Sequence, residues 1–326
     1  MTTPAPLSSR RPRRLIGAAL ATATAMFAFA APASATFPAS TNGLIAFSAD
    51  TGNGFQTYTV RLNGQDLDQI TNAVGDAVNA EWSPDGRTIV FELDHPNGAG
   101  CSVELMNFDG GSLRDLTRDD PNICEGQPAF TPDGERIVFE RYDAYTNVDA
   151  IWSMDLTGAD RHLITTGTDN GVTDPNVSPD GRTMSFIDSN GLPFGQALYT
   201  SRIDGSDLFQ LTPFSFDVAI KHDWAPDGRH LVFTVNADFP NPGDSANIAT
   251  IAPDGTGLRY VTSYTGGQLN AFAGSYSPDG SWIVFRLEDH GQYGLYMMHP
   301  DGTGQHPILK LSSFKPRFID WGSRTN

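Results

Sequence analysis

Short apolar stretches alternate with polar turns along the chain from residue 42 onward. Five of these stretches follow a turn of the form Ser/Thr/Ala-Pro-Asp-Gly, at residues 88–91, 137–139, 184–187, 231–233 and 282–285. Each stretch is a few residues long, rich in β-branched and aromatic residues and bounded by turn formers, which is typical of a buried strand. No helical periodicity interrupts the series, so the pattern predicts an all-β protein.

The four-residue turn recurs at a nearly constant interval, with its proline at Pro84, Pro132, Pro179, Pro226 and Pro278. A Ser or Thr at the first position can hydrogen-bond to its own backbone, and proline presets φ at the second. Aspartate and glycine suit the third and fourth positions of a type I turn. The residue before each turn is apolar or aromatic, namely Trp82, Phe130, Val177, Trp224 and Tyr276. Such repetition indicates an architecture built from one supersecondary unit.

A second tight turn occurs once in each unit and is an Asx-Gly pair in most of them, which favours a short hairpin. These turns are Asn63-Gly64, Asp109-Gly110, Thr157-Gly158, Asp204-Gly205, Asp254-Gly255 and Asp301-Gly302. An apolar strand precedes each turn, and another strand follows it. One unit therefore holds four antiparallel strands, which is the composition of a propeller blade.

The two ends of the repeat region are complementary. Residues 42–47 match the segment that follows the other Pro-Asp turns but lack the strand that should precede it, and residues 318–322 match that missing strand. Pairing them would satisfy both sheet edges. The sequence thus predicts a six-bladed β-propeller of four-stranded antiparallel blades, closed by the C-terminal strand, which completes the N-terminal blade. This single domain is expected to span residues 42–326.

An aromatic residue followed by Ser-Pro-Asp-Gly and an apolar strand resembles the WD-like repeat of the TolB family, and the resemblance covers about residues 42–322. It implies the propeller fold more strongly than any one function, because functions are grafted onto folds. The family's periplasmic member also carries an N-terminal α/β domain, whereas here only a short leader, residues 36–41, is expected before the first blade. Similar propellers accompany prolyl-oligopeptidase-type peptidases, but the chain has no Gly-x-Ser-x-Gly elbow.

Residues 1–35 have the pattern of a signal peptide. Four arginines lie between positions 10 and 14, an Ala-rich apolar stretch follows at 15–31, and Ala33-Ser34-Ala35 fits a cleavage site. We expect cleavage after Ala35 and a mature protein in the periplasm, in the cell envelope or outside the cell. General secretion and twin-arginine export are both compatible with the arginines.

The net charge narrows the possible partners, and the cysteines allow a disulfide. The formal net charge is −17, and such a surface repels nucleic acid and anionic membranes. The two cysteines, Cys101 and Cys124, fall in loops that emerge on the same face of one predicted blade. Because export permits oxidation, we predict a disulfide between them.

Polar residues on the innermost strands are candidates for ligand binding. They are Glu81, Asp174, Lys221, His222, Asp223 and Asp320. Alternation along a strand directs them toward the channel and its mouth. Two interpretations are open: an acidic channel that binds a cation or a cationic ligand, or carboxylates that are solvated or hydrogen-bonded to neighbouring turns.

The long loops between the second and third strands, and between successive units, contrast with the tight turns on the opposite face. Loops on a rigid scaffold commonly carry recognition, and aromatic side chains suit stacking on a sugar or anchoring a partner. The aromatic candidates in these loops are Tyr145, Phe194, Phe239 and Tyr264.

The favoured hypothesis is a secreted, monomeric, non-catalytic propeller that recognises a protein, peptide or glycan and needs no cofactor. The chain carries no catalytic motif to oppose it. The alternative is a metal-dependent lyase, lactonase or glycosidase with a divalent cation bound in the channel, which would require several converging ligands.

Overall fold

The computed structural model describes residues 41–117, 120–167, 171–189, 195–236 and 244–324. The predicted signal peptide and leader lie outside these residues. No helix in the described part of the chain is long and apolar enough to cross a membrane.

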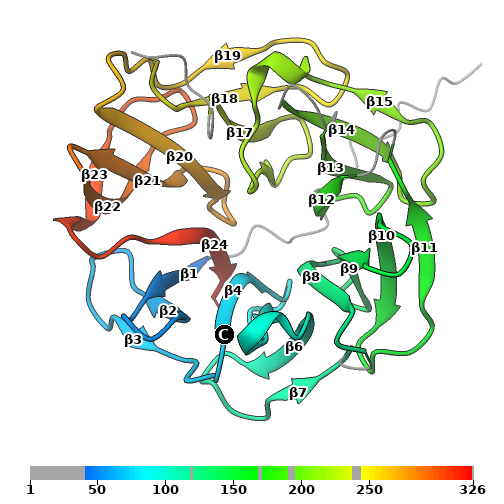
Figure 1. Ribbon diagram of the computed structural model, residues 1–326. Coiled ribbons are helices and arrows are strands. Elements are labelled where there is room, and N and C mark those ends of the chain that lie inside the picture. Colours follow the sequence, from blue (N-terminus) through cyan, green and yellow to red (C-terminus); the bar gives the residue numbers. More distant parts are fainter. Residues whose placement is uncertain (1–40, 118–119, 168–170, 190–194, 237–243, 325–326) are drawn as a thin grey trace, which may run out of the picture. The chain divides into compact units, whose positions relative to one another are not determined.

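Within these described residues, twenty-four strands form five sheets that surround a common axis (Figure 1). The first sheet has the order β24-β1-β2-β3 and joins the C-terminal strand to the N-terminal ones. Its strands are β1 (Asn42–Asp50), β2 (Phe55–Val60), β3 (Asp68–Gln69) and β24 (Arg317–Ser323). Antiparallel pairing of β24 with β1 agrees with the complementarity of the two ends of the repeat.

Three further sheets contain four consecutive strands each, in sequence order. The first comprises β12 (Val172–Val177), β13 (Thr183–Ser189), β14 (Gln196–Arg202) and β15 (Phe209–Gln210). The second comprises β16 (Asp223–Trp224), β17 (Leu231–Val235), β18 (Asn247–Ile251) and β19 (Arg259–Tyr260). The third comprises β20 (Leu269–Tyr276), β21 (Ile283–Asp289), β22 (Gln292–Met298) and β23 (His306–Ser312).

The remaining sheet has eight strands. They are β4 (Asp76–Trp82), β5 (Thr88–Asp94), β6 (Cys101–Asn107), β7 (Arg114–Asp115), β8 (Ile123–Phe130), β9 (Arg136–Asp143), β10 (Val148–Asp155) and β11 (His162–Thr165). Two short 3₁₀ helices, η1 (Pro96–Gly98) and η2 (Phe214–Phe216), lie in loops. The all-β propeller predicted from the sequence is confirmed, but the expected six separate sheets are replaced by five.

A disulfide explains why the sheet count differs from the prediction. Cys101 and Cys124 are bonded, as predicted, and their Cα atoms are 4.4 Å apart. This closeness lets β6 and β8 form a single parallel bridge at these two residues. The bridge merges the strands β4–β7 with β8–β11 into one hydrogen-bonded sheet.

One phenylalanine per repeat forms the centre of the core. These residues are Phe47, Phe91, Phe139, Phe186, Phe233 and Phe285, and each is at most 1% exposed. All occupy the same place in the apolar stretch that the repeat pattern predicts as a buried strand. Burial of each side chain contributes roughly 1.5–3 kcal/mol, and the clusters around Phe47 and Phe233 draw residues from adjacent sheets.

The Pro-Asp turns have the hydrogen bonds that their sequence predicts. In the first one, the Gly86 amide donates to the Ser83 carbonyl at 2.8 Å. The Ser83 hydroxyl donates to Asp85 Oδ1 at 2.7 Å and accepts from the Thr88 amide at 3.0 Å. Gly86 has a φ of +68°, which glycine adopts without strain. These tight turns fix the inner strands against their neighbours.

Candidate functional site

Three acidic side chains occupy the same position on inner strands, directly before the aromatic residue of the repeat. We call Glu81, Asp223 and Asp320 the axial carboxylates. Each accepts a hydrogen bond from the backbone N–H of the aromatic residue on the next inner strand. The pairs are Glu81 with Phe130 at 2.9 Å, Asp223 with Tyr276 at 2.8 Å, and Asp320 with Trp82 at 2.8 Å. The axial carboxylates therefore tie one inner strand to the next around the axis.

Ser275 plays the same part in another repeat, because its hydroxyl oxygen accepts a hydrogen bond from the Trp321 amide at 2.8 Å. Either a hydroxyl or a carboxylate can thus serve as the hydrogen-bond acceptor at this position. The second interpretation from the sequence, hydrogen bonding to neighbouring backbone, agrees with this geometry.

Lys221 lies among the carboxylates and is only 9% exposed. Burial opposes its charge, but Asp320, Glu81, Asp174 and Asp223 raise its pKa above the usual value. Burial and the charge of Asp320 raise the pKa of Asp223 to about 7, against the opposing effect of Lys221. Burial also raises the pKa of Glu81 well above its ordinary range. The channel therefore holds one ammonium group beside two carboxyl groups, those of Glu81 and Asp223, that resist ionisation.

A cavity of about 100 Å³ lies beside the axial carboxylates, close to the tight-turn end of the channel. The indole rings of Trp82, Trp224 and Trp321 also line it. Their Nε1 atoms are buried and have no hydrogen-bond partner among the described residues. A cavity of this size and polarity suits a few waters rather than an organic ligand.

Asp174, His222 and Ser185 form a buried chain of hydrogen bonds across two sheets. Asp174 Oδ2 accepts from His222 Nδ1 at 2.8 Å and from the backbone amides of Lys221 and His222 at 2.9 and 3.0 Å. His222 Nε2 lies 2.7 Å from Ser185 Oγ. Burial opposes ionisation of Asp174, but His222 and Lys221 hold its pKa below the usual value.

The order carboxylate, imidazole, hydroxyl is that of a serine-hydrolase triad, yet Ser185 and His222 are both 0% exposed. No substrate reaches a hydroxyl in that position. The sequence places His222 among the residues of the channel mouth; in the structure it directly precedes β16, and its buried ring contacts Asp174 of β12 and Ser185 of β13. Its role here is to connect adjacent sheets.

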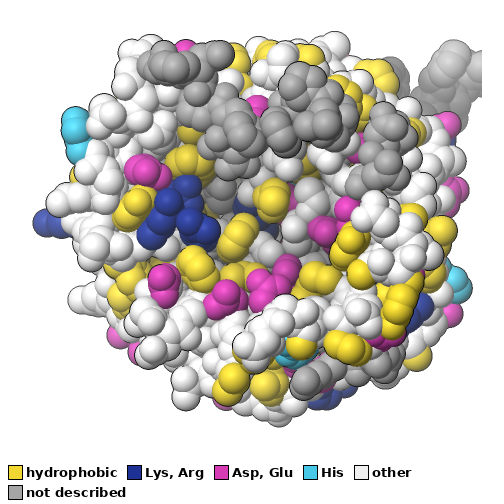
Figure 2. Space-filling view, in the orientation of Figure 1, with side chains coloured by type: hydrophobic (Ala, Val, Ile, Leu, Met, Phe, Trp, Pro, Cys, Tyr) yellow, Lys and Arg dark blue, Asp and Glu magenta, His cyan; other side chains and the backbone are white. Residues whose placement is uncertain are grey.

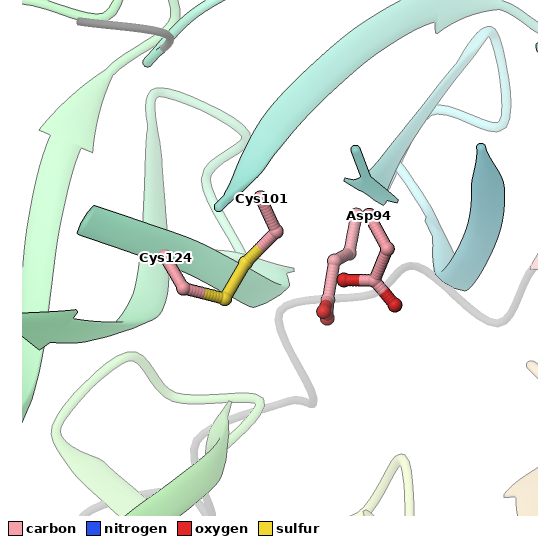
Figure 3. A group of neighbouring side chains, drawn as sticks. Asp94, Cys101 and Cys124 are labelled. Carbon is pink, nitrogen blue, oxygen red and sulfur yellow. A yellow bond between two sulfur atoms is a disulfide. The ribbon is translucent and has the colours of Figure 1, made fainter. Parts of the chain in front are cut away.

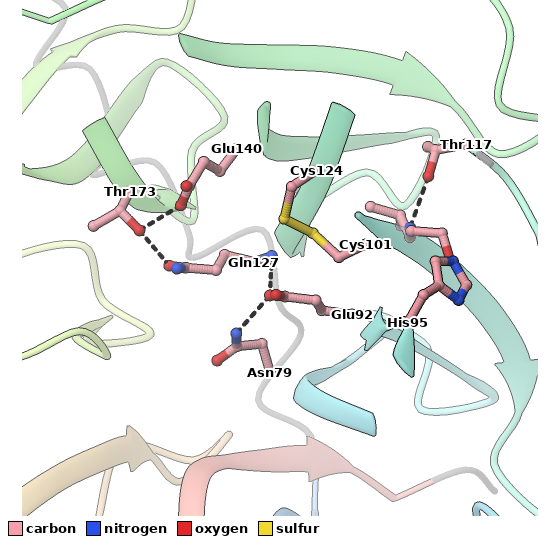
Figure 4. Close-up of a disulfide and its surroundings, with 11 residues drawn as sticks. Asn79, Glu92, His95, Cys101, Thr117, Cys124, Gln127, Glu140 and Thr173 are labelled. Atoms are coloured by element: carbon pink, nitrogen blue, oxygen red, sulfur yellow. Dashed lines mark hydrogen bonds between the residues drawn. A yellow bond between two sulfur atoms is a disulfide. The ribbon is translucent and has the colours of Figure 1, made fainter. Parts of the chain in front are cut away.

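A second polar group, the mouth cluster, consists of Asn79, Glu92, Gln127, Glu140 and Thr173 (Figure 4). Glu92 Oε2 accepts from Asn79 Nδ2 at 2.7 Å and from the Gln127 amide at 2.9 Å. Burial and the nearby charge of Asp94 raise the pKa of Glu92 to about 7. Sequence reasoning missed this cluster, because Glu92 and Glu140 lie on second strands and not on inner ones.

The Thr173 hydroxyl has one proton but contacts two oxygens, Gln127 Oε1 at 2.7 Å and Glu140 Oε2 at 2.5 Å. A protonated Glu140 resolves this, because its carboxyl group can donate to Thr173 Oγ1 while Thr173 donates to Gln127. Burial raises the pKa of Glu140 to about 8, against the opposing Thr173 contact. Glu140 is therefore a neutral hydrogen-bond donor at neutral pH.

Replacement of Glu140 by Gln is expected to flatten the pH dependence of stability. The carboxyl group titrates near 4.5 when unperturbed and near 8 in the fold. Between these values the unfolded chain has lost a proton that the folded chain keeps, so the free energy of unfolding falls as pH rises from 4.5 to 8. The slope of the free energy of unfolding against pH should approach about 1.4 kcal/mol per pH unit. Urea unfolding at several pH values measures the slope, with the exposed Glu135→Gln as control. Parallel profiles for wild type and Glu140→Gln would contradict this assignment.

Four potential metal ligands, Glu92, Asp94, Cys101 and Cys124, lie near the mouth cluster (Figure 3). Both sulfur atoms belong to the disulfide, so neither is the thiolate that binds a metal. Two carboxylates remain, and burial raises the pKa of both Glu92 and Asp94. The donor set does not fit a tightly held divalent ion.

The aromatic loop candidates differ in their surroundings. Tyr145 is 69% exposed, and its hydroxyl accepts from Asn122 Nδ2 at 2.7 Å. Tyr264 is partly buried against a core cluster and donates to Gln305 Oε1 at 2.8 Å. Phe194 and Phe239 lie outside the described residues. Of the two described candidates, Tyr145 offers the larger accessible surface.

Basic side chains gather on one side of the hollow at the mouth, over β20, β21 and β24 (Figure 2). Arg286, Lys315 and Arg317 line a cavity of about 520 Å³ there, and Lys221 lines it as well. Sequence reasoning did not find this group. Lys315 and Arg317 are two residues apart and so share a side of an extended segment, but Arg286 joins them only in the fold.

The sheets around the axis and the hydrogen bonds of the axial carboxylates define the class of protein: a β-propeller whose polar channel is held together by hydrogen bonds between inner strands. The chain belongs to the family described as the TolB beta propeller domain, whose sequence profile matches residues 19–222. The family resemblance inferred from the repeat is thereby confirmed.

Sequence relatives include a TolB homolog of Chlorobium luteolum, 29% identical over 249 residues, which cover 63% of this chain and 53% of that protein. An uncharacterized peptidase, YuxL, of Bacillus subtilis is 27% identical over 207 residues, covering 52% and 31%. The chain therefore spans about a third to a half of the length of such relatives.

Solved structures with the same fold include TolB from Acinetobacter baumannii, with a TM-score of 0.70, 17% identity, and coverage of 86% of this chain and 67% of that one. An oligogalacturonate lyase in complex with manganese has a TM-score of 0.56 and 17% identity, covering 81% and 73%. At these identities, the similarity shows the fold alone.

Proposed function

We propose that this protein is an exported, non-catalytic recognition propeller that binds a protein, peptide or glycan at the face bearing its long loops. The observation that carries the proposal is the engagement of the channel residues. Glu81, Asp174, Asp223 and Asp320 accept backbone hydrogen bonds, and His222 is buried between two of the sheets. Groups committed to holding strands together are poorly suited to proton or nucleophile transfer. Membership of the TolB beta propeller family, and the structural similarity to TolB, support a binding role.

We propose that the propeller has six blades, with the eight-stranded sheet contributing two. Each half of that sheet contains four strands and one core phenylalanine, Phe91 or Phe139, as the separate sheets do. The link between the halves is one bridge at the disulfide. The pairing of β24 with β1 supports the proposal that the C-terminal strand closes the ring.

Export is part of the proposal. A structural disulfide persists in an oxidising compartment and is rare in the cytosol, so the Cys101–Cys124 bond supports passage across the membrane. Cleavage after Ala35 would release the propeller into the periplasm, the envelope or the medium. N-terminal sequencing of the exported protein tests the cleavage point.

Capture experiments followed by hydrogen exchange test the binding face. The mature protein serves as bait for the envelope fraction of the producing cell, and exchange is compared with and without the captured ligand. We expect protection in loops 94–100, 144–148 and 263–267. Tyr145→Ala should weaken capture, whereas Tyr260→Ala on the outer strand β19, also exposed, should not. Protection confined to the Pro-Asp turns would contradict the proposal, and a stoichiometric, tightly bound divalent ion at the mouth would favour the enzymatic alternative.

A further inference from the structure

The basic pocket at the mouth is unusual in a chain with a net charge of −17. It comprises the walls of the 520 Å³ cavity formed by β20, β21 and the segment leading into β24. Three of its cations, Arg286, Lys315 and Arg317, come from just two stretches of chain. Figure 2 shows the Lys and Arg side chains together on one side of the hollow, with acidic side chains on the other. Cations that gather in one cavity attract anions locally, although the net negative charge of the whole surface repels them.

An aromatic ring lies close to each of these cations. The Arg286 guanidinium lies 3.8 Å from the centre of the Phe272 ring, the Lys315 ammonium 4.5 Å from that of Tyr293, and the Arg317 guanidinium 5.2 Å from that of Phe55. A ring orients a cation without cancelling its charge. The acidic residue that lines the cavity, Glu288, lies 3.8 Å from Lys315. Positive charge therefore predominates in the pocket.

One further observation indicates that the pocket is prepared for a ligand. Arg317 Nε is buried and has no hydrogen-bond partner among the described residues, and an unpaired buried donor is costly unless a ligand satisfies it. Burial and the charges of Arg286 and Arg317 also lower the pKa of Lys315, which an incoming anion would reverse.

We propose that the basic pocket binds the carboxylate of a small organic acid. Guanidinium groups present paired N–H donors that match the two oxygens of a carboxylate. Phe272 and Phe318 give the cavity apolar walls for the rest of the ligand, and its volume is that of a small-molecule site, not of a flat protein interface. This inference rests on the proposed binding function and adds to it a subsite with a defined ligand chemistry.

Calorimetric titration of the mature protein with galacturonate and with galactose tests the proposal, because the two sugars differ in the carboxylate at one carbon. Acetate, citrate and inorganic phosphate extend the series. We expect galacturonate or citrate to bind and galactose not to bind. Binding should weaken roughly tenfold or more in Arg317→Gln and in Lys315→Gln, since a hydrogen bond to a charged group contributes about 1.5–3 kcal/mol. Arg202→Gln, which removes an exposed cation on β14, is the matched control and should leave binding unchanged.

Arg286→Lys separates paired recognition from simple charge attraction. It keeps the charge but loses the planar fork, so carboxylate binding should weaken while thermal stability is retained. The proposal is overturned if no carboxylate binds more tightly than galactose, if phosphate binds as tightly as every carboxylate, or if the pocket variants bind like wild type. Should Arg317→Gln not fold, Lys315→Gln decides. Capture of a partner by the loops in variants that have lost carboxylate binding would leave the proposed function standing, so the two failures can be distinguished.

Discussion

A chain that ends before Lys315 is expected to lose most of its thermal stability. The truncation removes β24, whose Ile319 and Trp321 are 2% and 4% exposed in the core. It also removes Asp320, the acceptor for the Trp82 amide, and leaves the paired edge of β1 open. Loss of one large buried side chain costs about 3–5 kcal/mol, and a domain's whole stability is only about 5–15 kcal/mol. Calorimetry or circular dichroism during heating measures the effect.

The matched control for this truncation is a chain that ends after Ser323. It keeps all of β24 and loses the hydrogen bond from the Arg324 amide to the Thr41 carbonyl. Its melting temperature should fall by a few degrees at most. A chain without β24 that melts like the full one would show that this strand does not support the fold.

Asp174→Ala is expected to destabilise the protein by several kcal/mol, because each buried donor that loses its acceptor costs about 1–3 kcal/mol. The substitution leaves the His222 ring and two backbone amides, those of Lys221 and His222, without their shared acceptor. None of these donors can turn to water, because His222 is fully buried. Urea unfolding at neutral pH measures the loss.

Asp207→Ala provides the control for Asp174→Ala. Asp207 also pairs with a basic side chain, Arg202, but both side chains are largely exposed. Exposed pairs contribute little, so this variant should unfold close to wild type. Equal effects of the two substitutions would mean that the buried chain adds nothing beyond surface charge.

The sequence predicts the fold well because the same local physics repeats along the chain. Each Pro-Asp turn fixes the start of a buried strand, and each such strand places a phenylalanine in the core, as Phe186 and Phe233 illustrate. The disulfide was predictable as well, since the repeat places Cys101 and Cys124 close to loops that emerge on one face, although the structure has them in β6 and β8. The bridge that this bond forms between β6 and β8 was not, because a ladder between repeats depends on how closely two loops approach in space.

The channel residues illustrate what could not be predicted from the sequence. Sequence alternation identified Glu81, Asp223 and Asp320, but not that each would accept a backbone amide from the next repeat. The separations of 49 and 53 residues for Glu81 with Phe130 and Asp223 with Tyr276 are close to one repeat length, so that regularity is a usable signal. The basic pocket has no such signal, because Arg286 and Arg317 belong to different strands and meet only through packing.

The pairing of β24 with β1 also determines when the first sheet can be completed during synthesis. The partners are separated by more than 200 residues, as the pairing of Ala46 with Asp320 illustrates. At about 5–20 residues per second, β1 leaves the ribosome tens of seconds before its partner strand exists. Throughout that time its edge is an unsatisfied template for any other strand. A nascent chain in this state cannot complete the first sheet early. Until its last strand has been made, it can still pass through a narrow channel as an extended chain.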